Sequence, residues 1–285
     1  MTWPVDTWWP PSMVALPDGT SLAVRSRAGD RRPVLLVHGL ASNALLWRAV
    51  AETLAARGHT VAAVDLRGHG RSESPSTGYT TRQAARDVTA LATALGWQET
   101  GPLIVGQSWG ANVAIRSAAE SPLWGGAMCV DGGWIHLQPR FPTFDECWAA
   151  LQPPNFGTAT PDEGLARIRG FVRGWPTHSV DAIVGNLEVV DGRVRNRLAF
   201  EHHRSIVHSL WADDPAADYD RVSVPVSLIV AGKTASDDVD RALEQLPDAT
   251  ANWFPDAHHD IHLQHPELVS EQLFTLIDRV QGSAQ

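Results

Sequence analysis

The residues best suited to chemistry are a serine and the two glycines around it. The segment LIVGQSWGANVA, residues 103–114, places Ser108 between Gly106 and Gly110. An apolar run precedes this G-x-S-x-G pattern and an alanine-rich segment follows it, which indicates a tight turn from a buried strand into a helix. The glycines remove side chains that would clash in such a turn. The serine hydroxyl is then exposed beside a helix start that favours developing negative charge, so Ser108 is predicted to be a nucleophile.

A serine nucleophile needs a base, and the segment WFPDAHHDIHLQHPELV, residues 253–269, offers several histidines before a helix predicted to begin near Pro266. They are His258, His259, His262 and His265. His258 and His262 would share a face of a helix, as two metal ligands can. No cysteine or glutamate completes a ligand set and the H-E-x-x-H pattern is absent. We therefore expect no metal and no cofactor, and interpret the segment as the source of a histidine base.

Strands and helices alternate on either side of these residues. Apolar or alternating runs predict strands at 21–26, 34–37, 60–65, 103–106, 127–131 and 226–231. Periodic segments between them predict helices at 45–58, 81–96 and 110–120. This order is typical of an α/β fold with a mostly parallel sheet flanked by helices. The carboxyl edge of such a sheet is where ligands bind, which places Ser108 correctly for catalysis.

The alternation stops between about Trp134 and Asp220, where the segments are predicted to be helices or loops without an apolar strand. A helical insertion between two sheet strands is best interpreted as a cap over one edge of the sheet. The predicted organisation is therefore a core in two parts, residues 1–133 and 221–285, with a helical cap at residues 134–220.

Composition restricts the function classes and partners. The chain has 285 residues, 44% of them hydrophobic, and a net charge of −9 that is scattered along the sequence. This charge argues against a nucleic-acid partner. Two cysteines, Cys129 and Cys147, favour a reducing compartment. The N-terminal segment has no signal-peptide pattern and no stretch of about 18 apolar residues occurs. We expect a cytoplasmic protein without a membrane partner; the sequence leaves the oligomeric state open.

Three motifs resemble the α/β-hydrolase superfamily, and the resemblance extends over essentially the whole chain. They are VHGL at 37–40, DLRGHGRS at 65–72 and the G-x-S-x-G turn at 106–110. The resemblance implies a hydrolase in which some polar residues of the first two motifs shape loops and do not take part in the chemistry. These residues are His38, Asp65 and His69.

The resemblance also selects a base. In many relatives the catalytic histidine stands seven residues before the proline that opens the last helix, and counting back from Pro266 gives His259. The same relatives carry glycine just before that histidine, whereas this chain has His258. His259 is therefore the predicted base, and His258 is the alternative.

The acid of the triad has more than one candidate, because the position that usually carries it in relatives holds no acid here. Most relatives place this acid three residues after a glycine that follows the strand after the cap; here Gly232 leads to Ala235. Asp131, at the end of the run AMCVD, is the first choice. Asp237 or Asp238 is the alternative if the later loop is longer than usual.

The oxyanion hole and the substrate site complete the predicted site. By resemblance, the backbone N–H groups of Leu40 and Trp109 receive the negative charge of the intermediate, and Gly39 lets the backbone approach the substrate. Tryptophans in the cap region could bind an apolar substrate group. The candidates are Trp134, Trp148 and Trp175.

These residues predict a serine hydrolase that cleaves a small or medium apolar carboxylic ester or lactone through an acyl-enzyme. A carbon–carbon bond hydrolase or a thioesterase using the same triad is the alternative within the enzymes. A non-catalytic ligand-binding protein on the hydrolase fold is the alternative from a different class, and the empty acid position keeps it open.

Overall fold

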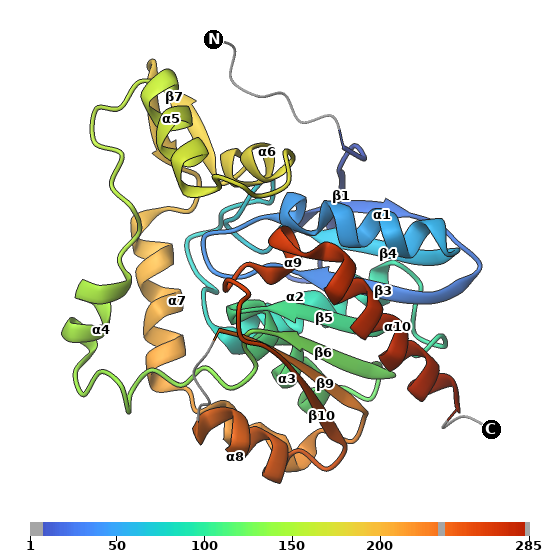
Figure 1. Cartoon of the computed structure of the whole chain (residues 1–285). Helices are drawn as coiled ribbons and strands as arrows, with labels where there is room; N and C mark the ends of the chain where they lie inside the picture. Colours follow the sequence, from blue (N-terminus) through green and yellow to red (C-terminus); the bar gives the residue numbers. More distant parts are fainter. Residues whose placement is uncertain (1–7, 233–236, 283–285) are drawn as a thin grey trace.

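A mixed β-sheet forms the centre of the computed structural model, which describes residues 8–232 and 237–282 (Figure 1). Its eight strands lie in the order β1-β2-β4-β3-β5-β6-β9-β10. Their bounds are β1 (Ser12–Ala15), β2 (Ser21–Arg27), β3 (Arg31–Val37), β4 (His59–Val64), β5 (Leu103–Gln107), β6 (Gly126–Val130), β9 (Val226–Ala231) and β10 (Ala249–Phe254). The β1–β2 and β2–β4 pairs are antiparallel, and every pair from β4 to β10 is parallel. The mostly parallel α/β sheet predicted from the sequence is confirmed.

Helices cover both faces of this sheet (Figure 1). Helices α1 (Arg48–Ala56) and α10 (Pro266–Gly282) pack on one face. Helices α2 (Thr81–Ala94), α3 (Trp109–Glu120) and α8 (Asp237–Gln245) pack on the other. No helix in the described ranges is both long and apolar enough to cross a bilayer.

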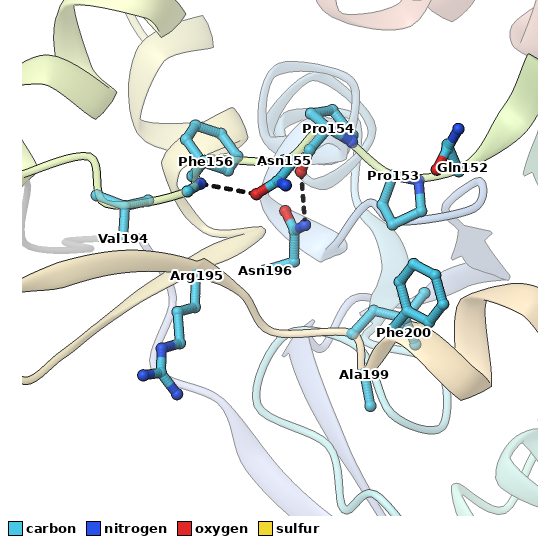
Figure 2. A pocket seen from close by; sticks show the side chains of 12 residues that line it. Gln152, Pro153, Pro154, Asn155, Phe156, Val194, Arg195, Asn196, Ala199 and Phe200 are labelled. Carbon is cyan, nitrogen blue, oxygen red and sulfur yellow. Dashed lines mark hydrogen bonds between the residues drawn. The ribbon is translucent and has the colours of Figure 1, made fainter.

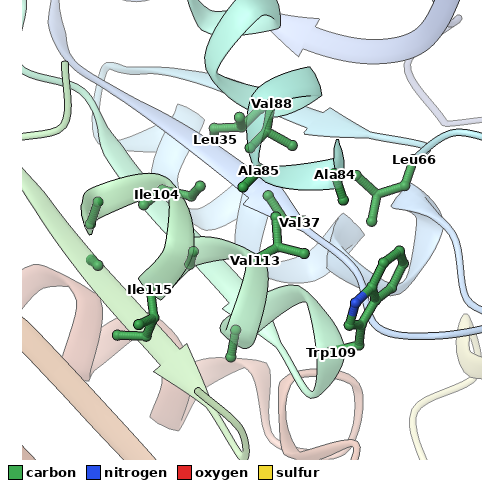
Figure 3. Packing of buried hydrophobic residues seen from close by; sticks show 14 of the residues in the cluster. Leu35, Val37, Leu66, Ala84, Ala85, Val88, Ile104, Trp109, Val113 and Ile115 are labelled. Carbon is green, nitrogen blue, oxygen red and sulfur yellow. The ribbon is translucent and has the colours of Figure 1, made fainter. Parts of the chain in front are cut away.

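Strand β3 shows why the central strands are continuous apolar runs. Successive side chains of a strand point to opposite faces of the sheet. Leu35 and Val37 accordingly join the core beneath α2 and α3, which Figure 3 shows, while Val34 and Leu36 join the core beneath α1 and α10. All four side chains are fully buried. A strand that is covered on both faces has no solvent side, so its sequence does not alternate with polar residues.

Two edge strands were not predicted. Strand β1 is mostly exposed, and β10 is only half-buried along its length, so neither carries a continuous apolar run. Strand β10 pairs with β9 and is the last strand of the sheet. The four histidines of the segment 253–269 therefore follow β10, one strand later than the last strand that was predicted, at 226–231. The helix predicted at 45–58 is divided into a 3-10 turn η1 (Ala44–Trp47) followed by α1.

The insertion between β6 and β9 contains more than helices. Its elements are α4 (Phe144–Leu151), α5 (Pro161–Phe171), α6 (Ser179–Val184), β7 (Leu187–Val190), β8 (Arg193–Asn196), α7 (Phe200–Ala212) and η2 (Pro215–Arg221). The prediction that no strand lies here was wrong, because β7 and β8 form an antiparallel hairpin. Its two-residue turn is Asp191-Gly192, with φ angles of 50° and 71°. An Asp-Gly pair between two short strands is a strong hairpin signal.

The insertion packs on the core through α7, η2 and α6. Ile206 and Leu210 of α7 join the core cluster beneath α2 and α3. The 3-10 segment η2 packs on α3, where Tyr219 donates a hydrogen bond to the carbonyl of Gly133 at 3.0 Å. Helix α6 contacts η1, and Figure 1 shows the hairpin and α5 beyond it, farther from the sheet.

Candidate active site

Ser108 occupies a strained turn between β5 and α3. Its φ of 53° and ψ of −122° lie in a region that non-glycine residues rarely adopt. A Cβ atom at Gly106 would lie 2.0 Å from the carbonyl oxygen of Gly110. A Cβ atom at Gly110 would lie 2.5 Å from the carbonyl oxygen of His38. Both positions therefore require glycine, and the turn holds Ser108 beside the loop that follows β3.

Asp131 and His259 are in direct contact. Asp131 follows β6, and its Oδ1 atom accepts a hydrogen bond from the backbone N–H of Ala231 at 2.9 Å. Its Oδ2 atom lies 2.5 Å from Nδ1 of His259, which is in the loop between β10 and α9 (Ile261–Gln264). One carboxylate oxygen is thus anchored to β9 and the other orients the imidazole. This contact holds the proton on Nδ1 and leaves Nε2 available as a base.

The loops that carry this pair are packed against Ser108. A Cβ atom at Gly132 would lie 2.3 Å from the carbonyl oxygen of Ser108, so the residue after Asp131 touches the turn. The Nε2 atom of Gln107 donates a hydrogen bond to the carbonyl of His259 at 3.2 Å. The loops of Asp131 and His259 therefore lie against the turn that carries Ser108, and within the described ranges no hydrogen bond joins the Ser108 and His259 side chains. Catalytic hydrogen bonds are often long until substrate binds.

Charge near His259 favours its protonated form. Burial acts to lower the pKa of His259, but the hydrogen bond and negative charge of Asp131 outweigh burial, and Asp260 adds to their effect. The pKa of His259 is therefore raised above its ordinary value. Nearly half of its side chain, 47%, remains exposed, so the ring is open to a ligand as well as to Asp131. An imidazole in this setting can accept a proton from a neighbouring hydroxyl.

The other candidate bases and acids lie elsewhere. The His258 ring faces the insertion, where its centroid is 5.0 Å from that of Trp175, and its Nδ1 accepts a hydrogen bond from the N–H of Asp260. Asp237 and Asp238 lie in the first turn of α8, and Asp238 is close enough to Tyr219 for its charge to act there. Ala235 lies outside the described residues. Asp131 is the candidate acid that the structure brings to His259.

The backbone amides of the two predicted oxyanion-hole residues lie in the segments beside Ser108. Leu40 and Trp109 donate no backbone hydrogen bond among the residues that the structure describes. A Cβ atom at Gly39 would lie 3.1 Å from Cβ of Ser108, so the loop carrying Leu40 passes beside the serine. The Trp109 indole is buried and donates to Oγ1 of Thr81 at 3.2 Å. Trp109 therefore presents its backbone to the site, and its side chain belongs to the core.

The polar residues of the first two motifs support the loops. Both His38 and His69 are buried and accept a backbone N–H at Nε2, from Leu66 at 2.9 Å and from Ala41 at 3.2 Å. Burial lowers the pKa of each ring. Asp65 accepts backbone N–H groups at both carboxylate oxygens, at 2.7 and 2.9 Å. With their hydrogen-bonding atoms used in this way, these three residues are not available for proton transfer.

The DLRGHGRS turn yields a prediction about stability. Gly70 has a φ of 52°, and a Cβ atom there would lie 2.2 Å from the Asp65 carboxylate carbon. Gly96 also has a positive φ, of 80°, but nothing lies within 4 Å of its Cβ position. Gly96→Ala should cost only the backbone penalty, about 1 kcal/mol. Gly70→Ala should lose about 1–3 kcal/mol more, measured by urea unfolding, because overpacking adds to that penalty. Equal losses would contradict the role given to Asp65.

The predicted substrate-binding tryptophans fall in different places. Trp175 lies beside His258, in the loop of the base, with the two rings tilted by 60°. Trp134 is half-buried, packs against the core and follows the Asp131 loop directly. Trp148 packs between α4 and α7, with its ring edge-on to Phe200 at 5.0 Å. Trp134 and Trp175 are therefore close to the loops of the site, and Trp148 contributes to the packing of the insertion.

Two positioning residues were missed by the sequence analysis. Besides Gln107, Asn112 of α3 accepts a hydrogen bond from the N–H of Gly133 at 2.9 Å and donates to the carbonyl of Ile135 at 2.8 Å. It fixes the loop that begins at Asp131. A buried asparagine inside a helix was the available signal, because such a side chain needs partners beyond its own helix.

Comparisons with known proteins identify the family and the fold. A family model described as "Alpha/beta hydrolase family" matches residues 34–272. A 2-(acetamidomethylene)succinate hydrolase from Mesorhizobium japonicum is 28% identical, and the match covers 90% of this chain and 92% of that protein. A soluble epoxide hydrolase from Corynebacterium sp. is 40% identical, but that match covers only 33% of this chain and 32% of that protein. A crystal structure of an E-2-(acetamidomethylene)succinate hydrolase superposes with a TM-score of 0.79 at 23% identity, covering 94% of this chain and 98% of that chain.

Proposed function

Given that this chain belongs to the α/β-hydrolase family and is an enzyme of that family, we propose that it is a serine hydrolase acting through an acyl-enzyme. The substrate class is a small or medium apolar carboxylic ester or lactone. The observation that carries the proposal is the 2.5 Å contact between Asp131 and His259, next to the strained turn at Ser108. A nucleophile, a base and an acid that orients the base are the parts that this chemistry needs.

The proposed reaction has two halves, acylation of Ser108 and hydrolysis of the acyl-enzyme, and the same triad acts in both. Ser108 Oγ attacks the ester carbonyl carbon and gives its proton to Nε2 of His259, while Asp131 stabilises the imidazolium. The N–H groups of Leu40 and Trp109 bind the oxyanion, each contributing about 2.7–4 kcal/mol of barrier reduction. His259 then protonates the leaving alkoxide. A water molecule then gives a proton to His259 and attacks the acyl carbon; the bond to Ser108 Oγ breaks, His259 returns the proton to that oxygen, and the acid is released.

An apolar substrate is supported by aromatic residues around the site. Trp134 and Trp175 lie beside the loops of Asp131 and His259, and Phe171 of α5 is 56% exposed with its ring centroid 5.5 Å from that of Trp175. An exposed phenylalanine beside a histidine loop favours contact with an apolar group. The insertion that carries these residues, 134–220, is proposed to act as a cap over one edge of the sheet.

The assignment is tested by labelling and by a substrate panel. A fluorophosphonate probe should label the wild-type protein and leave Ser108→Ala unlabelled. Absence of labelling in the wild type would favour a non-catalytic binding protein. The panel compares p-nitrophenyl esters and aromatic lactones with acyl thioesters, β-diketones and 2-(acetamidomethylene)succinate, the compound in the name of a relative. The highest kcat/KM should fall on an ester or a lactone; a thioester or diketone optimum would move the assignment to the corresponding alternative.

The raised pKa of His259 gives a pH prediction. His259 must be neutral to accept the serine proton, so kcat/KM should fall as pH decreases through the pKa of the free enzyme. Asp131 raises that pKa above its ordinary value of about 6.5, and the midpoint of the acid limb should lie above it. Burial, which lowers the pKa, remains when Asp131 becomes asparagine. In the residual activity of Asp131→Asn the midpoint should therefore move to lower pH, and an unchanged midpoint would contradict the contact.

A further inference from the structure

A small cavity lies where the insertion meets the core, beside the loop that carries Leu40. Ser42 and His69 line it from the core, and Pro153, Asn196 and His203 line it from the insertion. Its volume of about 10 Å³ is enough for about one water-sized group. We call it the inner cavity. No step of the proposed reaction uses these side chains.

Two buried polar atoms of the inner cavity lack partners. Oγ of Ser42 and Nδ1 of His203 make no hydrogen bond in the described structure, although these residues are only 8% and 4% exposed. An unsatisfied buried polar group costs about 1–3 kcal/mol. Both atoms belong to side chains that line the same space, so a single group placed there could satisfy both.

The hydrogen-bonding roles restrict what that group can be. Nε2 of His203 donates to the carbonyl of Leu151 at 2.9 Å, which leaves Nδ1 as an acceptor in the neutral ring. Burial lowers the pKa of His203, although the bond to Leu151 opposes this, and so the neutral ring is favoured. The ligand must donate to Nδ1 and can accept from Ser42. A hydroxyl does both within one heavy atom, whereas a carboxylate is too large and cannot donate.

A larger cleft of about 360 Å³, shown in Figure 2, lies next to the inner cavity. The two spaces share Pro153, Asn196 and Leu198 as lining residues. The remaining wall of the cleft includes the apolar side chains of Phe156 and Phe200. Asn196 donates a hydrogen bond to the carbonyl of Pro154 at 2.9 Å, and this bond, drawn in Figure 2, joins β8 to the loop opposite. The cleft therefore flanks the inner cavity on the side of the insertion.

The inner cavity is within reach of Ser108. Gly39 lies directly beside Ser108, with 3.1 Å from its Cβ position to the serine Cβ. Ser42 is three residues farther along, so the backbones of Gly39 and Ser42 are at most about 11 Å apart. An acyl chain of medium length attached at Ser108 can span this distance.

We propose that the inner cavity is a hydroxyl subsite: it binds a hydroxyl group on the acyl chain of the substrate through Ser42 and His203. The preferred substrates are then hydroxyacyl esters or the corresponding lactones. This inference rests on the proposed function, because it takes the acyl chain to be held at Ser108.

Binding of three matched ketones tests the subsite without turnover. They are 2-octanone, 8-hydroxy-2-octanone and 7-oxooctanoate, which share one chain and end in methyl, hydroxyl and carboxylate. Calorimetry on Ser108→Ala should give the hydroxyketone a Kd about tenfold lower than that of 2-octanone, as expected for two added hydrogen bonds. Adding Ser42→Ala should reduce this ratio to about one. Adding Ser205→Ala, which removes an exposed hydroxyl on α7 near His203, should leave the ratio unchanged.

The remaining outcomes overturn the proposal. Equal or weaker binding of the hydroxyketone, or no binding of any ketone, would show that the cavity is not a hydroxyl subsite. Tightest binding of 7-oxooctanoate would assign an anion site instead. A ratio that survives Ser42→Ala would place the hydroxyl elsewhere. Failure of the proposed function shows separately, as absence of probe labelling at Ser108, since the calorimetry uses a variant that lacks the serine.

Discussion

Replacing Ser108 with alanine should abolish turnover and leave the fold intact, with kcat reduced by about 10⁴–10⁶. The substitution removes a single oxygen. The structural role of Ser108 is carried by its backbone, whose N–H donates to the carbonyl of Val130 at 2.9 Å and whose φ of 53° is equally strained for alanine. The melting temperature should therefore match that of the wild type. Steady-state kinetics on the best ester of the panel and a thermal melt measure the two quantities.

Coupling to the base makes this prediction specific. His259→Ala should cost about as much as Ser108→Ala, and the double variant should cost little more, because residues that act as one unit are not additive. His258→Ala is the matched control, since its ring faces Trp175, and it should retain activity within about tenfold. A Ser108→Ala enzyme that still turns over and labels would refute the assignment, and a dead His258→Ala with an active His259→Ala would move the base by one residue.

The parts of the fold that could be predicted are those with a strong local signal. The central strands are buried on both faces, so each appears as a continuous apolar run, as Val34 to Val37 does. The turn at Ser108 was predictable for a related reason. Glycine is required where another backbone approaches within contact distance, as at Gly106 and Gly110, and that requirement appears directly in the sequence.

The edge strands and the hairpin were missed because their apolar pattern is weak. Strand β10 forms hydrogen bonds along one edge and is half-exposed, so its sequence, ATANWF, carries no continuous apolar run. The β7–β8 hairpin did carry a signal, the Asp191-Gly192 pair, but it lies in a segment whose neighbours are helices. In a short strand the turn residues are more informative than the apolar pattern.

The site was predictable to the extent that its members sit in motifs. Asp131 and His259 are 128 residues apart in the sequence, and no local pattern links them. Their contact depends on the order β5-β6-β9-β10, which brings the loops after β6 and β10 to one edge of the sheet. The inner cavity was out of reach, because Ser42 and His203 come from the core and the insertion and meet only in the folded chain.

Asp131→Asn should reduce kcat by about 10⁴ at an unchanged melting temperature. Asparagine keeps the shape, and its carbonyl can still accept the N–H of Ala231, which now binds Oδ1 at 2.9 Å. The substitution therefore alters the atom that replaces Oδ2, which contacts His259. An amide nitrogen facing Nδ1 of His259 donates where the carboxylate accepted, so the imidazole adopts the tautomer with its proton on Nε2 and loses its function as a base toward Ser108.

Asp237→Asn and Asp238→Asn are the controls for this change, because they alter the other two candidate acids in the same way. Both residues begin α8, where a carboxylate interacts favourably with the helix start, and their loss should cost less than about 1 kcal/mol of stability and leave kcat within about tenfold. An active Asp131→Asn with one inactive control would place the acid after β9, as in most relatives. If all three variants stayed active, His259 would work without a carboxylate partner. Because the melting temperature is measured beside kcat for every variant, a loss of fold is distinguished from a loss of the acid.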